Sequence, residues 1–223
     1  MDRRPHYRAT GEHVYRAVKM RVVACEFAPG RRIHLEPVAA RLGVSTTPVR
    51  EALNRLAAED LVVKAPRKGY FARRVTRRRV LGHYELTRLL LTHELERTLA
   101  CRRRMPADFE PIASVLHKLR RHEIADLHAL AAYNGDVFAG IASFGENAGI
   151  VHAVERANDQ LHYVRTLECR LLPGVQRDLA RLCELLLAER CDDARRAIDA
   201  YHERRTELLP DVLAHLSEQE PVQ

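Results

Sequence analysis

The stretch GVSTTPVREALNRL, residues 43–56, places hydroxyl side chains and an arginine at the start of a segment with helical periodicity. Thr46 and Thr47 can donate hydrogen bonds to phosphate oxygens or contact a thymine methyl group. Arg50 is long enough to reach O6 and N7 of guanine, a bidentate contact that contributes roughly 1–3 kcal/mol of discrimination between bases. These residue types at this spacing predict contact with a nucleic-acid groove.

A helix must position these side chains, and its start is expected near residue 46 or 47. Ser45 or Thr46 can cap the free backbone N–H groups, and Pro48 fits the first turn. Apolar residues then recur at three- and four-residue steps, which predicts a buried stripe of Val49, Ala52, Leu53 and Leu56. The opposite face carries Thr47, Arg50 and Asn54.

Further elements surround this helix. Helical periodicity covers residues 9–26 and 35–42, and Gly43 supplies a tight turn. Two short extended runs, 61–65 and 69–75, flank Pro-Arg-Lys, which predicts a β-hairpin with an exposed basic tip. This order of elements predicts a winged helix-turn-helix, whose second motif helix lies in the major groove.

The charge distribution supports a polyanionic partner. The formal net charge is +7, yet residues 1–79 hold 19 Lys and Arg against 7 Asp and Glu, whereas the remaining residues are net acidic. Basic charge confined to a small unit is typical of nucleic-acid binding. A merely arginine-rich, solvated surface would not explain why the rest of the chain is acidic.

From residue 77 onward the pattern is helical, with helices expected at roughly 78–104, 107–121, 124–143, 148–170, 174–189 and 192–216. The expected breaks lie at Pro106, near Gly145, at Pro173-Gly174 and around Cys191. The predicted fold is mainly α, with an N-terminal winged helix-turn-helix over residues 1–76. An all-helical effector-binding or dimerisation domain of about six helices is expected over residues 77–223.

Candidate DNA contacts extend beyond the helix start. Arg67 and Lys68 at the hairpin tip would contact phosphates or the minor groove, and Arg31, Arg32 and Arg55 are further phosphate candidates. For Arg31 and Arg32, a solvated surface charge is an equally good interpretation. The full predicted set is Ser45, Thr46, Thr47, Arg50, Asn54, Arg55, Arg67, Lys68, Gly69, Arg31 and Arg32.

The first third of the chain resembles a known family. The segment FAPGRRIHLEPVAARLGVSTTPVREALNRLAAEDLVVKAPRKGYF, and within it the unit GVS-x-TPVREAL-x-RL-x-x-E-x-LV, resembles the N-terminal domain of GntR-type bacterial transcription regulators over about residues 8–75. By helix count and scattered residues, the remainder is similar to the effector (FCD) domain of the FadR subfamily. The resemblance implies a homodimer on a short palindromic double-stranded operator, released or retained by a small organic acid or similar metabolite.

Three positions depart from the family pattern. Thr46 stands where the family usually has a base-reading arginine, and Glu36 stands where some members have a DNA-contacting arginine. Asp60 replaces a common glycine at the turn into the hairpin. We therefore expect an operator that differs from the usual one, with Arg50 providing more of the readout.

Of the four metal ligands that the resemblance implies, only His202 is present. The matching positions hold Gly135, Ala139, a residue near Ala180, and His202. Zinc sites in proteins need three or four ligands, so we predict no metal and no other cofactor. If a helix is shifted by one turn relative to this alignment, Asn134, Asp136 or His152 could serve as metal ligands instead.

Candidate effector contacts in the helical part are Arg88, Asn134, His152 and His202. Arg88 can clamp a carboxylate in a cavity, or it can pair with Glu85 three residues earlier on the same helix. Few of the family's polar groups remain. The alternative function is therefore a ligand-independent DNA-binding dimer whose helical part serves only for dimerisation or protein interaction.

Other classes of protein fit the sequence poorly. No apolar run approaches the roughly 20 residues that span a bilayer, and the N-terminus has no hydrophobic secretion signal, so we expect a cytoplasmic protein with no membrane partner. Glycine-rich phosphate loops, nucleophile elbows and His-Glu-x-x-His spacing are absent, so we predict no catalytic residues. We interpret the cysteines as free thiols: Cys25, Cys101, Cys169, Cys183 and Cys191.

Overall fold

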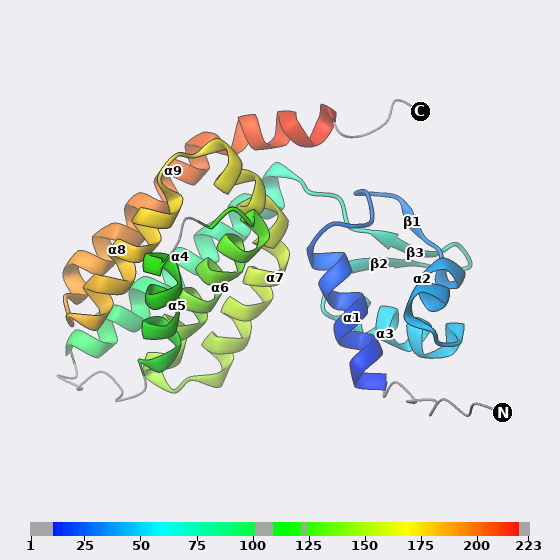
Figure 1. Cartoon of the computed structure of the whole chain (residues 1–223), viewed down its shortest axis with the longest axis horizontal. Helices are drawn as coiled ribbons and strands as arrows, with labels where there is room; N and C mark the ends of the chain where they lie inside the picture. Colours follow the sequence, from blue (N-terminus) through cyan, green and yellow to red (C-terminus); the bar gives the residue numbers. More distant parts are fainter. Residues whose placement is uncertain (1–10, 101–108, 122–123, 219–223) are drawn as a thin grey trace. The chain divides into compact units, whose positions relative to one another are not determined.

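The computed structural model describes residues 11–100, 109–121 and 124–218 (Figure 1). The chain divides into two compact units, Met1–Arg74 and Val75–Gln223. The fold is mainly helical, with a helix-turn-helix and a small sheet in the first unit and six α-helices, α4–α9, in the described part of the second. None of the helices in the described ranges is long and apolar enough to cross a membrane.

The first unit combines helices α1 (Gly11–Val23), α2 (Leu35–Leu42) and α3 (Thr46–Ala58) with strands β1 (Arg32–Ile33), β2 (Val62–Ala65) and β3 (Gly69–Ala72). The predicted hairpin is confirmed as the antiparallel pair β2–β3. The sequence did not predict β1, which pairs with the free edge of β3 and gives the order β1-β3-β2. Two residues are too short to show a strand period, so only the pairing partner reveals this strand.

The turn between α2 and α3 depends on a glycine. Gly43 has φ of 64° and ends α2 in the left-handed conformation, which costs glycine little. Its N–H donates to Ala40 O, and the N–H of Val44 donates to Ala39 O. These bonds satisfy the last carbonyls of α2 and redirect the chain into α3.

Helix α3 begins at Thr46, as predicted, and Ser45 occupies the N-cap position. The predicted cap is wrong, because the Ser45 hydroxyl makes no capping hydrogen bond. Ser45 is exposed, so water can bond to the free N–H groups and a side-chain cap is not required. The apolar stripe is confirmed: at most 2% of the surface is exposed for Val49, Ala52, Leu53 and Leu56.

The second unit contains α4 (Arg77–Ala100), α5 (Glu110–Arg121), α6 (Leu127–Ala142), the short 3₁₀ helix η1 (Ser143–Gly145), α7 (Ala148–Leu171), α8 (Val175–Leu187) and α9 (Cys191–Glu218). The expected breaks near Gly145 and at Pro173-Gly174 are present. The break expected around Cys191 is also present, because α8 ends at Leu187 and α9 begins at Cys191, and Glu189 between them has φ of 55°. The break expected at Pro106 lies outside the described residues.

Two clusters of buried side chains hold the helices of this unit together. In one, residues from α4, α5, α6, α7, α8 and α9 surround Phe138 and Ile141 of α6, which are completely buried. In the other, α4, α7 and α9 meet around Leu161 and Leu209. Cys25, Cys169, Cys183 and Cys191 are free thiols, as predicted, whereas Cys101 lies outside the described residues.

Candidate nucleic-acid interface

A basic hollow of about 360 Å³ opens beside the start of α3. Cationic side chains from three elements line it: Arg32 of β1, Arg50 of α3, and Lys64 and Arg67 of the hairpin. Glu36 is the acidic residue in the described lining. The hollow therefore presents clustered positive charge toward solvent, which favours a polyanionic ligand.

Arg50 lies where a groove-reading side chain is expected. It is exposed, whereas its neighbour Val49 is completely buried, so Arg50 points away from the core. It makes no hydrogen bond or ion pair with any described residue. Its guanidinium is free to contact a ligand. Thr47 is also exposed, and Thr46 is half-buried.

Asn54 is exposed on the face of α3 predicted for it, and its side chain bonds to the hairpin. Its Oδ1 accepts hydrogen bonds from Lys64 Nζ and from the Tyr70 hydroxyl, both at 2.8 Å. Lys64 and Tyr70 are themselves paired across β2 and β3. Asn54 therefore connects α3 to the hairpin. Lys64 escaped the sequence reasoning, and the only signal for it was a charged residue in the first predicted strand.

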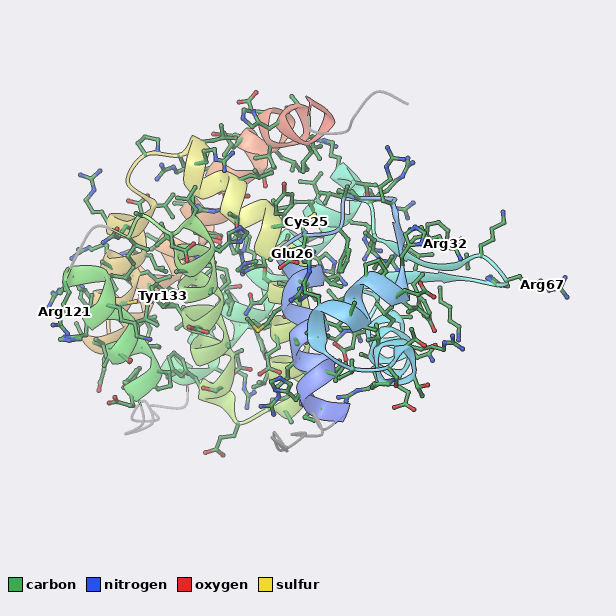
Figure 2. All side chains as sticks on the ribbon, turned by 45° about the vertical axis from the view of Figure 1, so that its right-hand side comes forward. Cys25, Glu26, Arg32, Arg67, Arg121 and Tyr133 are labelled. Atoms are coloured by element: carbon green, nitrogen blue, oxygen red, sulfur yellow. The ribbon has the colours of Figure 1, made fainter. Side chains whose placement is uncertain are left out.

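The hairpin tip holds Arg67 in an unusual backbone conformation. Arg67 has φ of 60° and lies in the turn closed by the bond from Lys68 N to Ala65 O at 3.1 Å. Left-handed backbone costs a non-glycine residue roughly 1–2 kcal/mol. Figure 2 shows the Arg67 side chain extending from the outer end of the hairpin. A strained, exposed cation at a loop tip is consistent with a role in binding.

Gly69 and Arg32 lie against each other beside this tip. Gly69 has φ of 96°, and a β-carbon at this position would lie 3.4 Å from Arg32 Nε. Arg32 is exposed on β1 opposite Phe71 and lines the hollow. Arg31 is also exposed, but it does not belong to the lining. Of the arginine pair, only Arg32 is thus grouped with Arg50 and Arg67.

Arg55 points toward α1. Its NH1 donates to Glu12 Oε2 at 3.0 Å, and its guanidinium lies 3.7 Å from the centre of the Tyr15 ring. The Tyr15 hydroxyl in turn donates to Glu59. These contacts join the first helix to α3, so Arg55 helps to hold the fold around α3.

In the second unit, the four predicted effector residues do not share one cavity. His152 is exposed on α7. Arg88 and His202 line a hollow of about 410 Å³ between α4 and α9, and Asn134 lines another of about 200 Å³. Arg88 Nε contacts Asp199 Oδ1 at 2.7 Å, so it pairs between helices and not with Glu85.

His202 is occupied by neighbours within the core. It is 3% exposed, its Nδ1 lies 2.8 Å from Ile198 O, and its Nε2 lies 3.1 Å from Thr87 Oγ1. Burial lowers the pKa of His202 to about 4, so the ring is neutral at pH 7. A neutral ring that donates from Nδ1 accepts from Thr87 at Nε2, which leaves no free nitrogen for a metal.

Described residues contain no group of three or more His, Cys, Asp or Glu side chains that could hold a metal ion. The positions matched to the family's ligands hold Gly135, Ala139 and Ala180 besides His202. Asn158 Nδ2 donates to Gly135 O, so backbone and amide groups occupy part of this region. The residues present do not fit a divalent metal.

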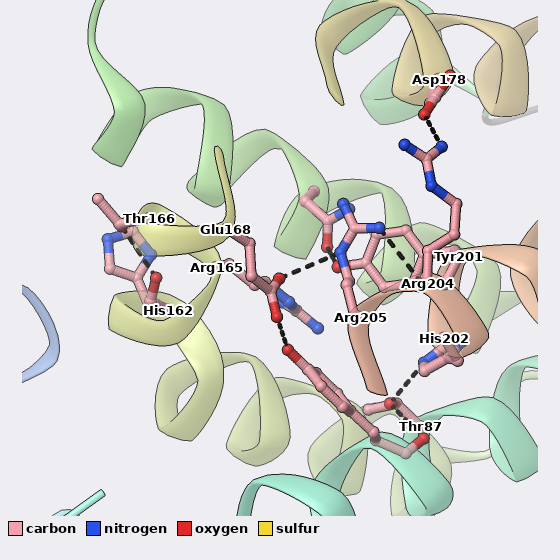
Figure 3. A network of polar contacts seen from close by, with 12 residues as sticks. Thr87, His162, Arg165, Thr166, Glu168, Asp178, Tyr201, His202, Arg204 and Arg205 are labelled. Carbon is pink, nitrogen blue, oxygen red and sulfur yellow. Dashed lines mark hydrogen bonds and ion pairs between the residues drawn. The ribbon is translucent and has the colours of Figure 1, made fainter. Parts of the chain in front are cut away.

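The second unit instead contains a buried charged network (Figure 3). Arg165, Glu168 and Arg205 are each at most 4% exposed. Arg205 Nε donates to Glu168 Oε2 at 3.1 Å, and the Tyr84 hydroxyl donates to the other carboxylate oxygen. Arg165 donates to Asn158 Oδ1 at 2.8 Å, but its buried Nε and NH2 have no acceptor among the described residues. Two guanidinium groups thus accompany one carboxylate.

This network borders the 200 Å³ hollow between α6, α8 and α9. Asn134, Tyr201 and Arg205 are among its polar lining residues, and the Tyr201 hydroxyl donates to Asn134 Oδ1 at 3.1 Å. Arg204 and Asp178, which form an ion pair at 2.6 Å, also line it. Sequence reasoning missed Arg165 and Arg205, because no local pattern distinguishes a buried arginine from an exposed one.

Comparisons with known proteins agree with this geometry. Residues 10–71 match the model of the bacterial regulatory proteins, gntR family. The chain is 29% identical over 148 residues to the Nta operon transcriptional regulator of Aminobacter aminovorans, covering 66% of this chain and 69% of the relative. It is 31% identical over 111 residues to the gluconate operon transcriptional repressor of Bacillus subtilis, covering 50% of this chain and 43% of the relative.

Solved structures share the fold along most of the chain. A GntR protein from Rhodococcus sp. RHA1 gives a TM-score of 0.74 at 19% identity, covering 92% of this chain and 97% of that structure. E. coli McbR/YncC gives a TM-score of 0.64 at 17% identity, covering 94% and 97%. The basic hollow therefore lies in the part of the chain, residues 10–71, that is similar to gntR-family bacterial regulatory proteins, and the relatives reported above are transcriptional regulators.

Proposed function

We propose that the chain binds a two-fold symmetric DNA operator as a homodimer, with α3 in the major groove and the hairpin on the flanking backbone or minor groove. The observation that carries this proposal is Arg50, exposed and without a partner among the described residues, beside Arg32, Lys64 and Arg67. Arg50, Thr46 and Thr47 would contact bases, and Arg32, Lys64, Arg67 and Lys68 would contact phosphates.

Selection from a pool of random double-stranded DNA at moderate salt tests the proposal. The expected result is enrichment of a palindromic consensus whose half-sites lie about one helical turn apart. Protein that enriches no consensus above the starting pool would overturn sequence-specific binding. Enrichment of a single, non-repeated site would overturn the two-fold arrangement.

The homodimer follows from the size of the contact surface. One α3 and one hairpin offer few base contacts, whereas two linked half-sites increase affinity through effective concentration. Light scattering at micromolar concentration should give twice the chain mass. A single-chain mass both with and without operator DNA would rule the dimer out.

We infer further that the second unit is of the FCD type and senses a small carboxylate in the 200 Å³ hollow. The support is its lining, where Asn134, Tyr201 and Arg205 can bond to an anion and nearby Arg165 adds uncompensated positive charge. Arg88 and His152 have no part in this site, because Arg88 pairs with Asp199 and His152 is exposed.

A thermal-shift screen of carboxylate metabolites distinguishes a sensor from a scaffold. A carboxylate that raises the Tm of the wild type and of Arg88→Ala, but not of Asn134→Leu, would support the sensor. If no carboxylate shifts the wild-type Tm, the second unit serves for dimerisation or protein interaction, and regulation does not depend on an acidic ligand.

A further inference from the structure

Helix α4 exposes an apolar patch in the middle of its outer face. Leu86 is 39% exposed and Leu89 is 60% exposed, although most large apolar side chains of this unit are buried. Both leucines belong to a stripe of exposed residues at steps of three and four, which places them on one side of the helix. The stripe consists of Arg78, Gly82, Leu86, Leu89, His93 and Glu96.

The stripe is complementary in charge and in apolar character to the same stripe on a second, antiparallel copy of α4. Its apolar centre lies between a basic end at Arg78 and an acidic end at Glu96, about 27 Å apart along the helix. If a second α4 lies antiparallel across it, Leu86 faces Leu89 of the second copy and Gly82 faces His93. Arg78 then lies within one residue of the position opposite Glu96.

The charged ends of the stripe are available for such pairing. Arg78 and Glu96 are both exposed, and neither forms an ion pair or hydrogen bond with a described residue. Arg88, by contrast, lies beside the stripe and is already paired with Asp199. A two-fold axis brings the same surface of the two chains together. Each residue in a contact and its partner residue must therefore both lie on that one surface.

We propose that the outer face of α4 is the surface through which two copies of this chain associate, in an antiparallel arrangement centred between Leu86 and Leu89. The inference rests on the proposed homodimer and names its interface. Four leucines from the two chains form the buried centre, and two Arg78–Glu96 pairs flank it. Gly82 has no side chain, and a β-carbon there would meet no atom within 4 Å, so space is open for His93 of the second copy.

A charge placed in the apolar centre tests the position of the interface. Leu89→Arg should raise the dimer dissociation constant at least about tenfold, because two like charges would meet near the axis. Met20→Arg, the same change at a residue that is 72% exposed in the first unit, should leave the dimer intact. Analytical ultracentrifugation gives the constants, and circular dichroism checks that both variants are folded.

Charge reversal at the two ends tests the antiparallel register independently. Arg78→Glu and Glu96→Arg should each weaken the dimer, and the double variant should restore it, because reversed charges meet again across the axis. Arg77→Glu changes a neighbouring arginine outside the stripe and is the matched control. Single variants that weaken the dimer without recovery in the double variant would overturn this register.

Failure of this inference differs from failure of the homodimer. If the wild type is dimeric and Leu89→Arg dissociates no more readily than Met20→Arg, the α4 interface is wrong and the homodimer stands. If the wild type is a monomer with and without operator DNA, the homodimer itself is wrong, and with it the interface.

Discussion

Two pairs of arginines, Arg50 and Arg67 in the first unit and Arg165 and Arg205 in the second, occupy opposite environments. In the first unit, Arg50 and Arg67 are exposed and have no ion pair with a described residue. In the second, Arg165 and Arg205 are buried among helices, and Arg205 pairs with the buried carboxylate of Glu168. The same side chain is thus open to solvent at Arg50 and Arg67 and part of a buried network at Arg165 and Arg205. At these four positions the packing around the guanidinium, and not the residue type, decides whether it is open to a ligand.

Burial also changes the pKa of Glu168, the carboxyl group that pairs with Arg205. It raises the pKa of Glu168 to about 7, although Arg205 acts in the opposite direction. Exposed arginines in the first unit keep their hydration until a ligand replaces it, which makes their contacts sensitive to salt. The two regions should thus respond to different variables, pH for the buried network and ionic strength for the basic hollow.

The largest effect is expected from breaking the buried pair. Arg205→Met removes the partner of a buried carboxylate, so the free energy of unfolding at pH 8 should fall by about 3–5 kcal/mol. Urea unfolding followed by circular dichroism measures the change. Arg67→Met, the same substitution at an exposed arginine, is the control and should unfold like the wild type. An Arg205→Met variant as stable as wild type at pH 8 would show that the pair contributes nothing to the fold.

The pH dependence of the same network follows from Glu168. Because its folded pKa is raised from 4.5 to about 7, the protonated form is favoured in the fold. The contribution of protonated Glu168 to the free energy of unfolding is fully present below pH 4.5 and is lost as the pH rises toward 7. Glu168→Gln cannot ionise, so its stability relative to wild type should increase between pH 5 and pH 8. A constant difference over this range would contradict the raised pKa.

Among the exposed arginines, Arg50 should have the largest effect on binding. Arg50→Ala should abolish operator preference, a loss of roughly 1–3 kcal/mol per half-site contact, with an unchanged circular dichroism spectrum. Fluorescence anisotropy with operator and random DNA measures the preference. Arg31→Ala, an exposed arginine outside the basic hollow, is the matched control. A folded Arg50→Ala variant that still prefers the operator would exclude base readout by this residue.

A smaller and different effect is expected at the hairpin tip. Arg67→Ala and Lys68→Ala should each weaken binding to all sequences and reduce the salt slope by about one unit, because one cation fewer neutralises a phosphate. Arg67→Gly should weaken binding equally yet unfold at equal or slightly higher urea concentration, because glycine relieves the positive φ. A salt slope that stays unchanged in all three variants would place the tip away from DNA.

The smallest effect concerns metal. We predict that protein purified without a polyhistidine tag carries no stoichiometric divalent ion in its second unit, and that EDTA leaves its Tm unchanged. The Nδ1 of His202 lies against Ile198 O and its Nε2 against Thr87 Oγ1, so a metal at Nε2 would have to displace the Thr87 hydroxyl. Elemental analysis showing one metal per chain, absent from His202→Ala, would restore a metal-assisted effector site.

Local patterns predicted much of this fold, as α2 and α3 illustrate. The bounds expected for α2, 35–42, are those observed, and the predicted stripe of α3 is buried. The apolar periodicity predicts these helices well because one face of each packs on a core built from residues nearby in the sequence. Strand β1 escaped prediction, because its two residues depend on the edge of β3, more than 30 positions further along the chain.

The sequence by itself determined the order of the helices and the hairpin, the separation of a basic first third from an acidic remainder, and the helix position that turns Arg50 outward. These properties depend on neighbours within a few turns of chain. Only the tertiary structure decided that Asn54 bonds to Lys64 and Tyr70, that Arg55 lies on Tyr15, and that Arg205 meets Glu168. Such contacts join side chains from different elements, and whether a charge is solvated or buried depends on how those elements pack.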